Sequence, residues 1–339
     1  MRVLSGIQSS GKIHLGNYFG AIAQFLELQN SGNECLIFIA DLHALTTVRD
    51  ADKLRELTRD VALDYMALGL DPSNPNVALF RQSDIAEVTE LMWLLMAVTP
   101  MAMLENAHSY KDKIAKGIAP EAGLFTYPVL MAADILVYDS DEVPVGKDQQ
   151  QHLEIARDIA VKFNATFDPK YISKLNEAKG REDVHGILKL PRARIQKATE
   201  SVVGVDGEKM SKSYGNTIDL FGEDKPTQKR IMGIKTDSTP VEAPKDTNTP
   251  VHDLLKLFAS AEEMAEIDKS FREGGKGYGH YKQRLAELIF ERFGAARQKR
   301  KELEKDPKAV EDVLAKGAEQ ARERARIVLD RVRRAVGIR

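Results

Sequence analysis

Two short polar segments, far apart in the chain, each have the composition of a phosphate-binding loop. The first is Ser-Ser-Gly-Lys-Ile-His-Leu-Gly-Asn at residues 9–17, where an apolar start gives way to a helical pattern. The second is Gly-Glu-Lys-Met-Ser-Lys-Ser at residues 207–213. Glycines allow a ligand to approach the backbone, N–H groups at a helix start bind phosphate, and paired lysines suit a leaving pyrophosphate. Either segment alone is more simply a solvated loop, but together they indicate a nucleotide-handling enzyme that a lysine loop closes.

The composition bounds the class of protein. A chain of 339 residues with 43% hydrophobic and 29% charged residues has room for two globular domains. The formal net charge of -2 gives no overall positive field, so any nucleic-acid contact must use local basic patches. The longest apolar run, residues 91–98, is too short to cross a membrane and no signal pattern precedes it, so we expect a cytoplasmic protein. The single cysteine, Cys35, excludes a disulfide framework or a cysteine zinc site, and we expect it to be buried.

The periodicity of apolar residues predicts an α/β fold. Short apolar runs at 35–39 and 77–80 have the pattern of buried strands, and residues 202–205 are expected to form the last strand of the sheet. They alternate with helical patterns at 52–68, 87–98, 124–138 and 150–163, which implies a Rossmann-like parallel sheet. The final third has helical spacing throughout. We therefore expect a catalytic domain at 1–205, with a helical insertion at about 100–165, and a lysine loop with an all-helical domain at 206–339.

A set of motifs carries a family resemblance. His14-Leu15-Gly16-Asn17 resembles the HIGH signature, and Lys209-Met210-Ser211-Lys212-Ser213 is the KMSKS signature, in the expected order. Between them lie Ala-Asp-Leu-His-Ala-Leu-Thr at 40–46, Tyr-Pro-Val-Leu-Met-Ala-Ala-Asp-Ile-Leu at 127–136 and Val-Pro-Val-Gly-Lys-Asp-Gln at 143–149. The set resembles the bacterial-type tryptophanyl-tRNA synthetases, a group of class I aminoacyl-tRNA synthetases, over nearly the whole chain.

The resemblance implies a reaction in two steps. L-Tryptophan attacks the α-phosphorus of ATP, with Mg²⁺ bound through the ATP phosphates, and the tryptophanyl-adenylate then acylates tRNA(Trp). It also implies a homodimer. The closest alternative is a tyrosyl-tRNA synthetase, and the others are a catalytically silent synthetase-like regulator that binds tryptophan or RNA and a small-molecule nucleotidyltransferase. The Ala-Ala-Asp and Val-Pro-Val-Gly-Lys-Asp-Gln sequences favour tryptophan over tyrosine.

The tryptophan site is expected around Asp134, whose carboxylate accepts the indole N–H in that family. A ligand without this N–H would leave the carboxylate unpaired, which makes the contact a strong discriminator. The alternative for Asp134 is a surface acid on an amphipathic helix. The remaining residues that the resemblance assigns to the tryptophan site are Leu4, Gly6, His43, Tyr127, Met131, Val143, Val145 and Gln149.

The resemblance also assigns the ATP site. Its residues are Gln8, Ser9, Ser10, Gly16, Asn17, Gly146, Lys147, Asp148, Val202, Lys209, Met210, Ser211, Lys212 and Ser213. Catalysis rests on Lys113, Lys209 and Lys212 as cations and on Gln8 and Asn17 as hydrogen-bond partners, with no protein nucleophile and no protein metal site. Lys111 is an alternative to Lys113, and Val203 to Val202. Ser9 replaces a frequent proline, which leaves the stiffness of the first loop open, and Lys147 replaces a frequent acid.

Basic residues gather near the carboxyl end. They are Lys299, Arg300, Lys301, Arg322, Arg324, Arg326, Arg331, Arg333 and Arg334. The resemblance implies that this region reads the anticodon through contacts that salt would weaken. For each single arginine, a solvated helix face with interleaved acids is the simpler interpretation.

Overall fold

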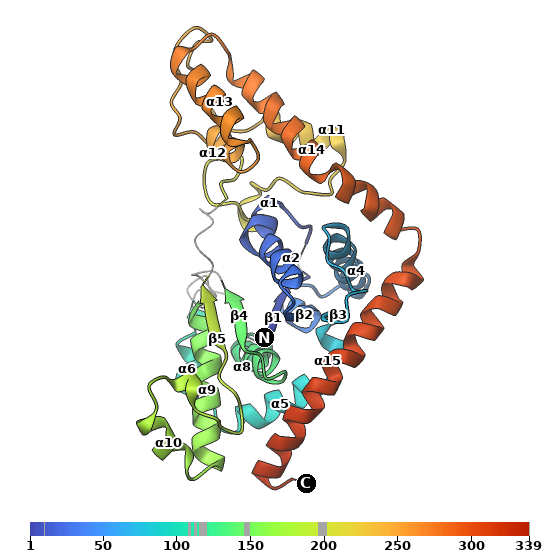
Figure 1. Ribbon diagram of the computed structural model, residues 1–339, viewed down its shortest axis with the longest axis vertical. Coiled ribbons are helices and arrows are strands. Elements are labelled where there is room, and N and C mark those ends of the chain that lie inside the picture. The colour runs from blue at the N-terminus through green and yellow to red at the C-terminus, as the bar shows by residue number, and fades with distance from the viewer. Residues whose placement is uncertain are drawn as a thin grey trace.

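A computed structural model describes residues 1–9, 11–107, 110–111, 114, 121–145, 150–195 and 202–338 of the chain. Its centre is a parallel sheet with the strand order β3-β2-β1-β4-β5 over these residues (Figure 1). The strands are β1 (Arg2–Ile7), β2 (Glu34–Ile39), β3 (Val77–Arg81), β4 (Glu142–Val145) and β5 (Arg192–Ile195). The order reverses between β1 and β4, which is where ligands bind in folds of this kind. The predicted Rossmann-like α/β class is confirmed.

Helices cover both faces of the sheet. Their bounds are α1 (Leu15–Asn17), the π-helical turn η1 (Tyr18–Ile22), α2 (Ala23–Asn30), α3 (Asp41–Ala44), α4 (Ala51–Ala67), η2 (Gln82–Asp84), α5 (Ala86–Met96), α6 (Met101–Glu105), α8 (Ala122–Leu136), α9 (Gln150–Phe167), α10 (Tyr171–Glu177) and η4 (Arg181–Asp183). After the sheet come η5 (Lys212–Tyr214), α11 (Asp224–Met232), α12 (Pro250–Lys256), α13 (Ala261–Glu273), α14 (Tyr278–Leu303) and α15 (Pro307–Val336). The helices predicted at 52–68, 87–98, 124–138 and 150–163 are therefore confirmed, as is the helical final third. No helix of the described part of the chain is long and apolar enough to cross a membrane.

The two faces of the sheet pack into separate apolar clusters because side chains alternate along each strand. Leu4 pairs in register with Leu36, and both pack toward α5 and α8. Val3 pairs with Cys35, and both pack toward α2 and α4. Strands buried on both faces read as continuous apolar runs, which is why β2 and β3 were predictable.

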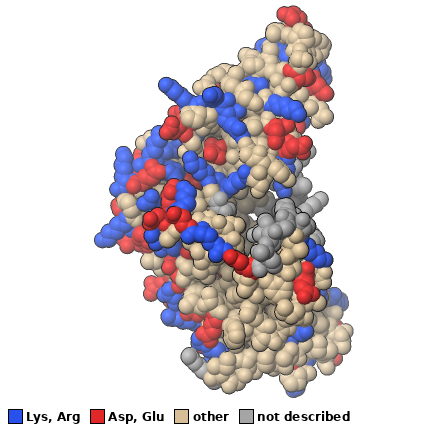
Figure 2. Space-filling view, turned by 180° about the vertical axis from the view of Figure 1, so that it is seen from behind, with Lys and Arg blue, Asp and Glu red and all other residues tan. Residues whose placement is uncertain are grey.

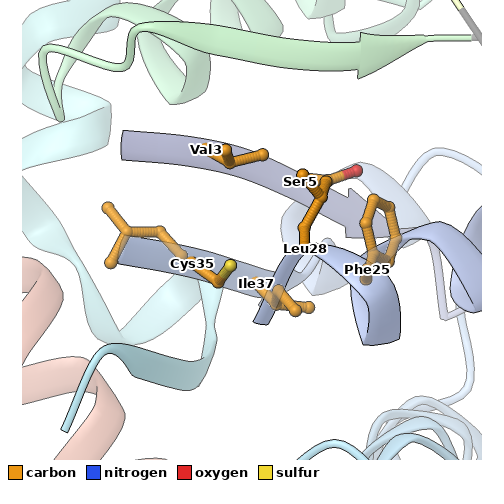
Figure 3. A pocket seen from close by; sticks show the side chains of 7 residues that line it. Val3, Ser5, Phe25, Leu28, Cys35 and Ile37 are labelled. Carbon is orange, nitrogen blue, oxygen red and sulfur yellow. The ribbon is translucent and has the colours of Figure 1, made fainter. Parts of the chain in front are cut away.

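Cys35 lies where the sheet packs on α2 (Figure 3). The side chains of Val3, Phe25 and Leu28 surround it, together with those of Ser5 and Ile37, and they leave a void too small for a water molecule. Burial raises the pKa of the Cys35 thiol to about 11, so the thiol stays protonated at neutral pH. The prediction of a buried cysteine is confirmed.

The fifth strand is not where the apolar pattern predicted it. Residues 202–205 were expected to form it, but β5 is Arg192–Ile195, and Val203 instead forms an antiparallel bridge with Lys209. The sequence of β5, Arg-Ala-Arg-Ile, lacks the continuous apolar pattern of a buried strand. β5 is an edge strand whose Arg192 and Arg194 are exposed, and charged side chains are common on the edge strands of sheets. The apolar pattern at Val202 reflects burial of this residue beneath the hairpin that Val203 and Lys209 close, and not a place in the sheet.

The last helix returns to the sheet. α15 runs along β3 and also touches α4 and α5 (Figure 1). Its arginines pair with the sheet region: Arg324 lies 3.0 Å from Glu34, Arg331 lies 2.6 Å from Asp139, and Arg333 donates to Glu90 at 2.6 Å. At the crossing Gly317 touches the backbone of β3, so that a Cβ on it would overlap the carbonyl oxygen of Leu79 and lie 2.7 Å from its carbonyl carbon.

We predict that Gly317→Ala destabilises the protein. Alanine in place of glycine normally stabilises a helix by about 0.5–1 kcal/mol, but here the methyl group must push α15 away from β3, at a cost of about 1–3 kcal/mol. Chemical denaturation measures the change. Gly294→Ala in α14 is the matched control, since nothing lies within 4 Å of its added Cβ, and it is expected to stabilise. Equal gains for both variants would show that α15 does not lie against β3 in solution.

Candidate active site

The candidate site begins where three neighbouring strands end. Parallel register aligns Ile7 of β1 with Ile39 of β2, and Ile39 with Arg81 of β3. The residues that follow therefore share one edge of the sheet, and Gln8 donates through Nε2 to the carbonyl oxygen of His43 at 3.0 Å. Strand register and a side-chain hydrogen bond thus bring polar groups from separate segments together.

One face of α8 supplies the predicted tryptophan contacts. Tyr127, Met131 and Asp134 are spaced four and three residues apart, so they lie on the same side of the helix. His43 of α3 connects this face to the sheet: its ring contacts Tyr127 edge-on, with the ring centres 6.3 Å apart, and its Nε2 lies 2.9 Å from Asp134 Oδ2. The structure therefore brings four of the predicted tryptophan residues together.

Asp134 is 1% exposed, so the interpretation as a surface acid is wrong. Its carboxylate accepts from Gln82 Nε2 at 2.9 and 2.7 Å and faces His43. The orientation of Gln82 is fixed because its amide oxygen accepts from the backbone N–H of Leu42 at 3.1 Å, which leaves the NH₂ group for Asp134. Burial raises the pKa of Asp134, and the hydrogen bonds from His43 and Gln82 oppose that rise.

These two partners correct one expectation. A ligand without an N–H does not leave the Asp134 carboxylate unpaired, since Gln82 and His43 already contact it. Asp134 would therefore distinguish a ligand with an N–H from one without it less strongly than a buried carboxylate that has no protein partners, because only one of its acceptor positions remains for a ligand. The two protein partners instead hold the carboxylate in a single orientation.

The apolar side of this region comes from the sheet. Leu4 and Val143 are both buried in the cluster that contains α8. Gly6 lies against Phe38 of β2, so closely that a Cβ would overlap the Phe38 carbonyl oxygen and come within 3.0 Å of its ring. Val145 ends β4, and its side chain lies outside the described part of the chain. Leu4, Gly6 and Val143, three of the residues that the resemblance assigns to the tryptophan site, thus lie in the sheet on the α8 side.

The first polar loop is anchored at both ends. Ser9 is fully buried, and its hydroxyl lies 3.3 Å from that of Thr58 in α4. The hydrogen bond between Ser9 and Thr58 thus ties the loop to α4 at Ser9, the position where the resemblance leads us to expect proline. Gly11 has φ +140°, a conformation that only glycine adopts easily. At the other end His14 caps α1, and Asn17 Oδ1 accepts from the His14 backbone N–H at 3.1 Å.

His14 carries a buried ring with an unused atom. Its Nδ1 has no hydrogen-bond partner, and the side chain is 5% exposed. Burial, and then the charge of Lys212, lowers the pKa of His14 to about 4, while Asp219 opposes this. The imidazole is therefore neutral at physiological pH. The π-helical turn η1 follows directly, and such turns are frequent at functional sites.

The second polar loop is organised by Asn216. This buried residue donates to Asp206 at 2.8 Å and to the Lys209 carbonyl at 3.1 Å, and its Oδ1 accepts from the Ser211 N–H at 2.8 Å. Ser211 in turn caps η5 by accepting from the Ser213 N–H at 3.3 Å. Lys209 and Ser213 are exposed. The loop is therefore shaped by its own polar contacts before any ligand binds.

The two loops meet. Lys212 Nζ donates to the carbonyl oxygen of Gly11 at 3.0 Å, although the two residues are 201 positions apart in the sequence. Next to this contact Met210 is buried in the core, and a Cβ on Gly16 would lie 3.6 Å from its Cβ. Desolvation by the surrounding loops lowers the pKa of Lys212, and the charge of Asp219 opposes that effect.

Several predicted site residues lie outside the described part of the chain. They are Ser10, Lys113, Gly146, Lys147, Asp148 and Gln149. The alternative cation Lys111 is described and exposed. Val202 is buried, and its carbonyl accepts from the Met210 N–H at 2.8 Å, whereas Val203 is half-buried. Among the residues that the structure describes, no group of three or more His, Cys, Asp or Glu side chains could hold a metal ion.

Sequence reasoning missed the residues that orient others. Gln82 directly follows β3, and Asp41 comes two residues after the end of β2 and accepts from the backbone N–H of Ser83 at 3.0 Å. Their position after buried strands could have identified them. Asn216 and Asp219 gave no such signal, because their roles depend on the folded shape of the lysine loop. Two polar loops that meet beside the carboxyl edge of a doubly wound parallel sheet define an α/β protein of the nucleotide-binding class.

Comparison with known proteins identifies the family. Residues 1–294 match the family model described as tRNA synthetases class I (W and Y). A tryptophan–tRNA ligase of Rhodopirellula baltica is 53% identical over 340 residues, covering 100% of both chains. The crystal structure of Campylobacter jejuni tryptophanyl-tRNA synthetase complexed with ADP and tryptophan is 45% identical with a TM-score of 0.87, covering 99% of this chain and 100% of that one. A tyrosyl-tRNA synthetase of Archaeoglobus fulgidus, 20% identical with a TM-score of 0.58, covers 88% of this chain and 90% of its own and shares the fold alone.

The chain belongs to the class I tRNA synthetases of the tryptophan and tyrosine group.

Proposed function

We infer that this protein is a tryptophan–tRNA ligase, which activates L-tryptophan with ATP and transfers it to tRNA(Trp). The observation that carries the proposal is the buried Asp134 carboxylate, which Gln82 and His43 hold on the face of α8 that also presents Tyr127 and Met131. A fixed buried acceptor beside apolar side chains suits an indole ring, which is large and apolar and has one N–H donor. Near full-length similarity to tryptophan–tRNA ligases supports the same substrate.

The amino acid would lie between α8 and the sheet. Its indole N–H would donate to Asp134, and Leu4, Gly6, Met131, Val143 and Val145 would contact the ring. Tyr127, His43 and Gln149 would bind the ammonium and carboxylate groups. Orientation is the protein's contribution here, since an aligned carboxylate reacts far faster than a free one.

ATP would lie where the two loops meet. Gln8, Gly16 and Asn17 would bind its phosphates together with Ser9 and Ser10, and the family match adds Gly146, Lys147, Asp148 and Val202 for the nucleoside. The tryptophan carboxylate oxygen attacks the α-phosphorus, the bond from that phosphorus to the bridging oxygen breaks, and pyrophosphate leaves with the electron pair. Lys209, Lys212 and Lys113 would neutralise the charge that develops. Mg²⁺ bound to the phosphates would supply further neutralisation.

The lysine loop has a contact that substrate can replace. In this structure the Lys212 ammonium donates to a backbone carbonyl, that of Gly11, and a phosphate oxygen is a stronger acceptor for the same charge. The exchange would move the lysine by a small distance, because Gly11 belongs to the loop proposed to bind the phosphates.

We further propose a catalytic unit at 1–205 and a tRNA-binding helical part at 206–339. Figure 2 shows Lys and Arg interleaved with Asp and Glu along the edge that α14 and α15 follow. Several basic residues there are already paired: Arg300 lies 2.9 Å from Asp60, and Arg322 donates to the Asp84 carbonyl at 2.6 Å. Anticodon contacts would therefore fall to basic residues outside these pairs, such as Lys299 and Lys301.

A second copy of the chain is the proposed partner. Trp93 of α5 is 69% exposed and Met101 of α6, the next helix in the chain, is 63% exposed. A symmetric dimer would bury the same patch from both copies. The family resemblance supports this state.

We predict that the protein catalyses ATP–pyrophosphate exchange with tryptophan and not with tyrosine. Asp134→Asn should lower kcat/KM for tryptophan by about 10–100-fold, because the asparagine NH₂ group would oppose the donors of Gln82 and His43. Asp312→Asn, at an exposed position of α15, is the control. Exchange with tyrosine in place of tryptophan would make the protein a tyrosine enzyme, and no exchange at all would indicate a silent regulator.

Lys212→Ala should separate catalysis from binding. Loss of a cation that acts on the leaving group should reduce kcat for exchange by about 10²–10³-fold, with the KM for tryptophan changed less than about threefold. Steady-state exchange kinetics give both values, and Lys225→Ala on the surface of α11 serves as the control. An equal loss in kcat and in tryptophan binding would mean that Lys212 only supports the structure of the site.

Trp93→Arg should convert the dimer to a monomer. The arginine places an unpaired charge at the centre of the proposed apolar contact, so the sedimentation coefficient at micromolar concentration should fall to that of a single chain. Ile327→Arg is the control, since Ile327 is also 57% exposed but lies on α15. A wild-type protein that sediments as a monomer would refute the proposal directly.

A further inference from the structure

Arg297 of α14 connects the helical part of the protein to the segment that follows the lysine loop. Its Nη1 donates to the carbonyl oxygen of Leu220 at 2.6 Å. Its Nη2 donates to the carbonyl oxygen of Gly222 and to Asp224 Oδ1, the latter at 2.6 Å. The Arg297 side chain is 11% exposed, whereas that of Asp224 is 75% exposed. A mostly buried guanidinium group thus holds the backbone that leaves the lysine loop.

The same backbone segment is paired with the first polar loop. Leu220 donates its N–H to the carbonyl oxygen of Ile13 at 3.1 Å, and Leu15 donates its N–H to the carbonyl oxygen of Ile218 at 3.1 Å. These four residues are buried, so both hydrogen bonds are shielded from water. Leu220 is therefore bonded to the first polar loop through its N–H and to Arg297 through its carbonyl oxygen.

The orientation of the Arg297 guanidinium is set within α14. Its central carbon lies 5.2 Å from the ring centre of Phe290, which is two helical turns earlier. A planar guanidinium over an aromatic ring presents its N–H groups in fixed directions. A lysine ammonium lacks this planar fork, so the contact depends on the shape of the side chain as well as on its charge.

The helix α14 also contacts the turn that follows the first polar loop. Tyr18 comes directly after Asn17, and its ring meets that of Phe293 edge-on, with the ring centres 4.9 Å apart. Both rings are buried. Phe293 and Arg297 are four residues apart and therefore lie on the same side of α14. One side of this helix thus reaches the turn after the loop and the backbone that is paired with the loop.

We propose that Arg297 is a positioning residue for ATP binding and adenylate formation. The proposal rests on the proposed function, in which Gly16 and Asn17 of the first polar loop bind the phosphates. Arg297 fixes Leu220, and Leu220 fixes the loop to which those two residues belong. A displacement of about 1 Å in such a loop can cost about 100-fold in rate. The helical part of the protein would then contribute to amino-acid activation as well as to tRNA binding.

Arg297→Met tests this role, because methionine keeps an apolar side chain beside Phe290 and removes the side-chain N–H donors. In ATP–pyrophosphate exchange, kcat/KM for ATP should fall by about 10–100-fold. Calorimetric titration with tryptophan alone should give an affinity changed by less than about threefold, since Asp134 and its partners lie in a separate site. The same titration counts the folded sites to which kcat is referred. Arg297→Lys keeps the charge and should lose about 3–10-fold in kcat/KM for ATP.

Two control variants separate positioning from general stability. Arg284→Met removes another arginine of α14, which donates to Glu263 at 2.6 Å and to Glu291 at 2.9 Å. It should lower the free energy of unfolding and leave kcat/KM for ATP unchanged per folded site. Asp224→Asn removes the exposed ion pair of Arg297 and keeps its two carbonyl contacts, so kcat/KM for ATP should change by less than about twofold.

An unchanged kcat/KM for ATP in Arg297→Met, or an equal loss in either control, would overturn the proposal. A loss of tryptophan affinity as large as the loss in kcat/KM for ATP would do the same, because it would show a general loss of structure. If Arg297→Met does not fold, Arg297→Lys decides by the same measurements. If the wild-type protein catalyses no exchange, the proposed function fails. Calorimetric titration with ATP then still tests Arg297, since Arg297→Met should weaken ATP binding by about 10-fold.

Discussion

The parallel register of β1, β2 and β3 is the constraint on which the site depends. It places the residues after Ile7, Ile39 and Arg81 at one edge, and so brings Gln82 and His43 to the buried carboxylate of α8. A buried acid without such donors would be costly, so the pairing of the strands and the position of the acid stabilise each other. The proposed amino-acid site therefore depends on the strand register, whereas the proposed phosphate site depends on the two polar loops.

The contact between the two polar loops has a strength suited to its role. One exposed ammonium-to-carbonyl hydrogen bond, from Lys212 to Gly11, contributes on the order of 1 kcal/mol, which a charged phosphate can replace. The rest of the lysine loop is held more firmly, by Asn216 and by the buried Met210. A loop with a fixed shape and a weak outer contact can move as a unit, and it does not have to refold when substrate binds.

Much of this architecture could be predicted from the sequence, and the exceptions have physical causes. Strands buried on both faces and amphipathic helices have direct apolar patterns, so β2, β3 and α4 were predictable. The edge strand β5 was missed because alternating arginines mask it, while the apolar residues at 202–205 are buried beneath a hairpin. In the site, Asp134 and Lys212 have recognisable sequence contexts. Gln82 and Asn216 act by orienting other groups, and the only signal for Gln82 is its position directly after a buried strand, while Asn216 has none.

Extensive contacts cross the proposed boundary between the catalytic and the helical part. Arg300 of α14 pairs with Asp60 of α4, and α15 lies along β3 with Gly317 against its backbone. The helical part is thus attached to the sheet along one side, while α11, α12 and α13 project beyond it (Figure 1). The lysine loop connects the sheet to these projecting helices. The projecting helices are therefore joined to the sheet region in two ways, through the hairpin and through α14, which packs on α4 as well as on α11 and α12.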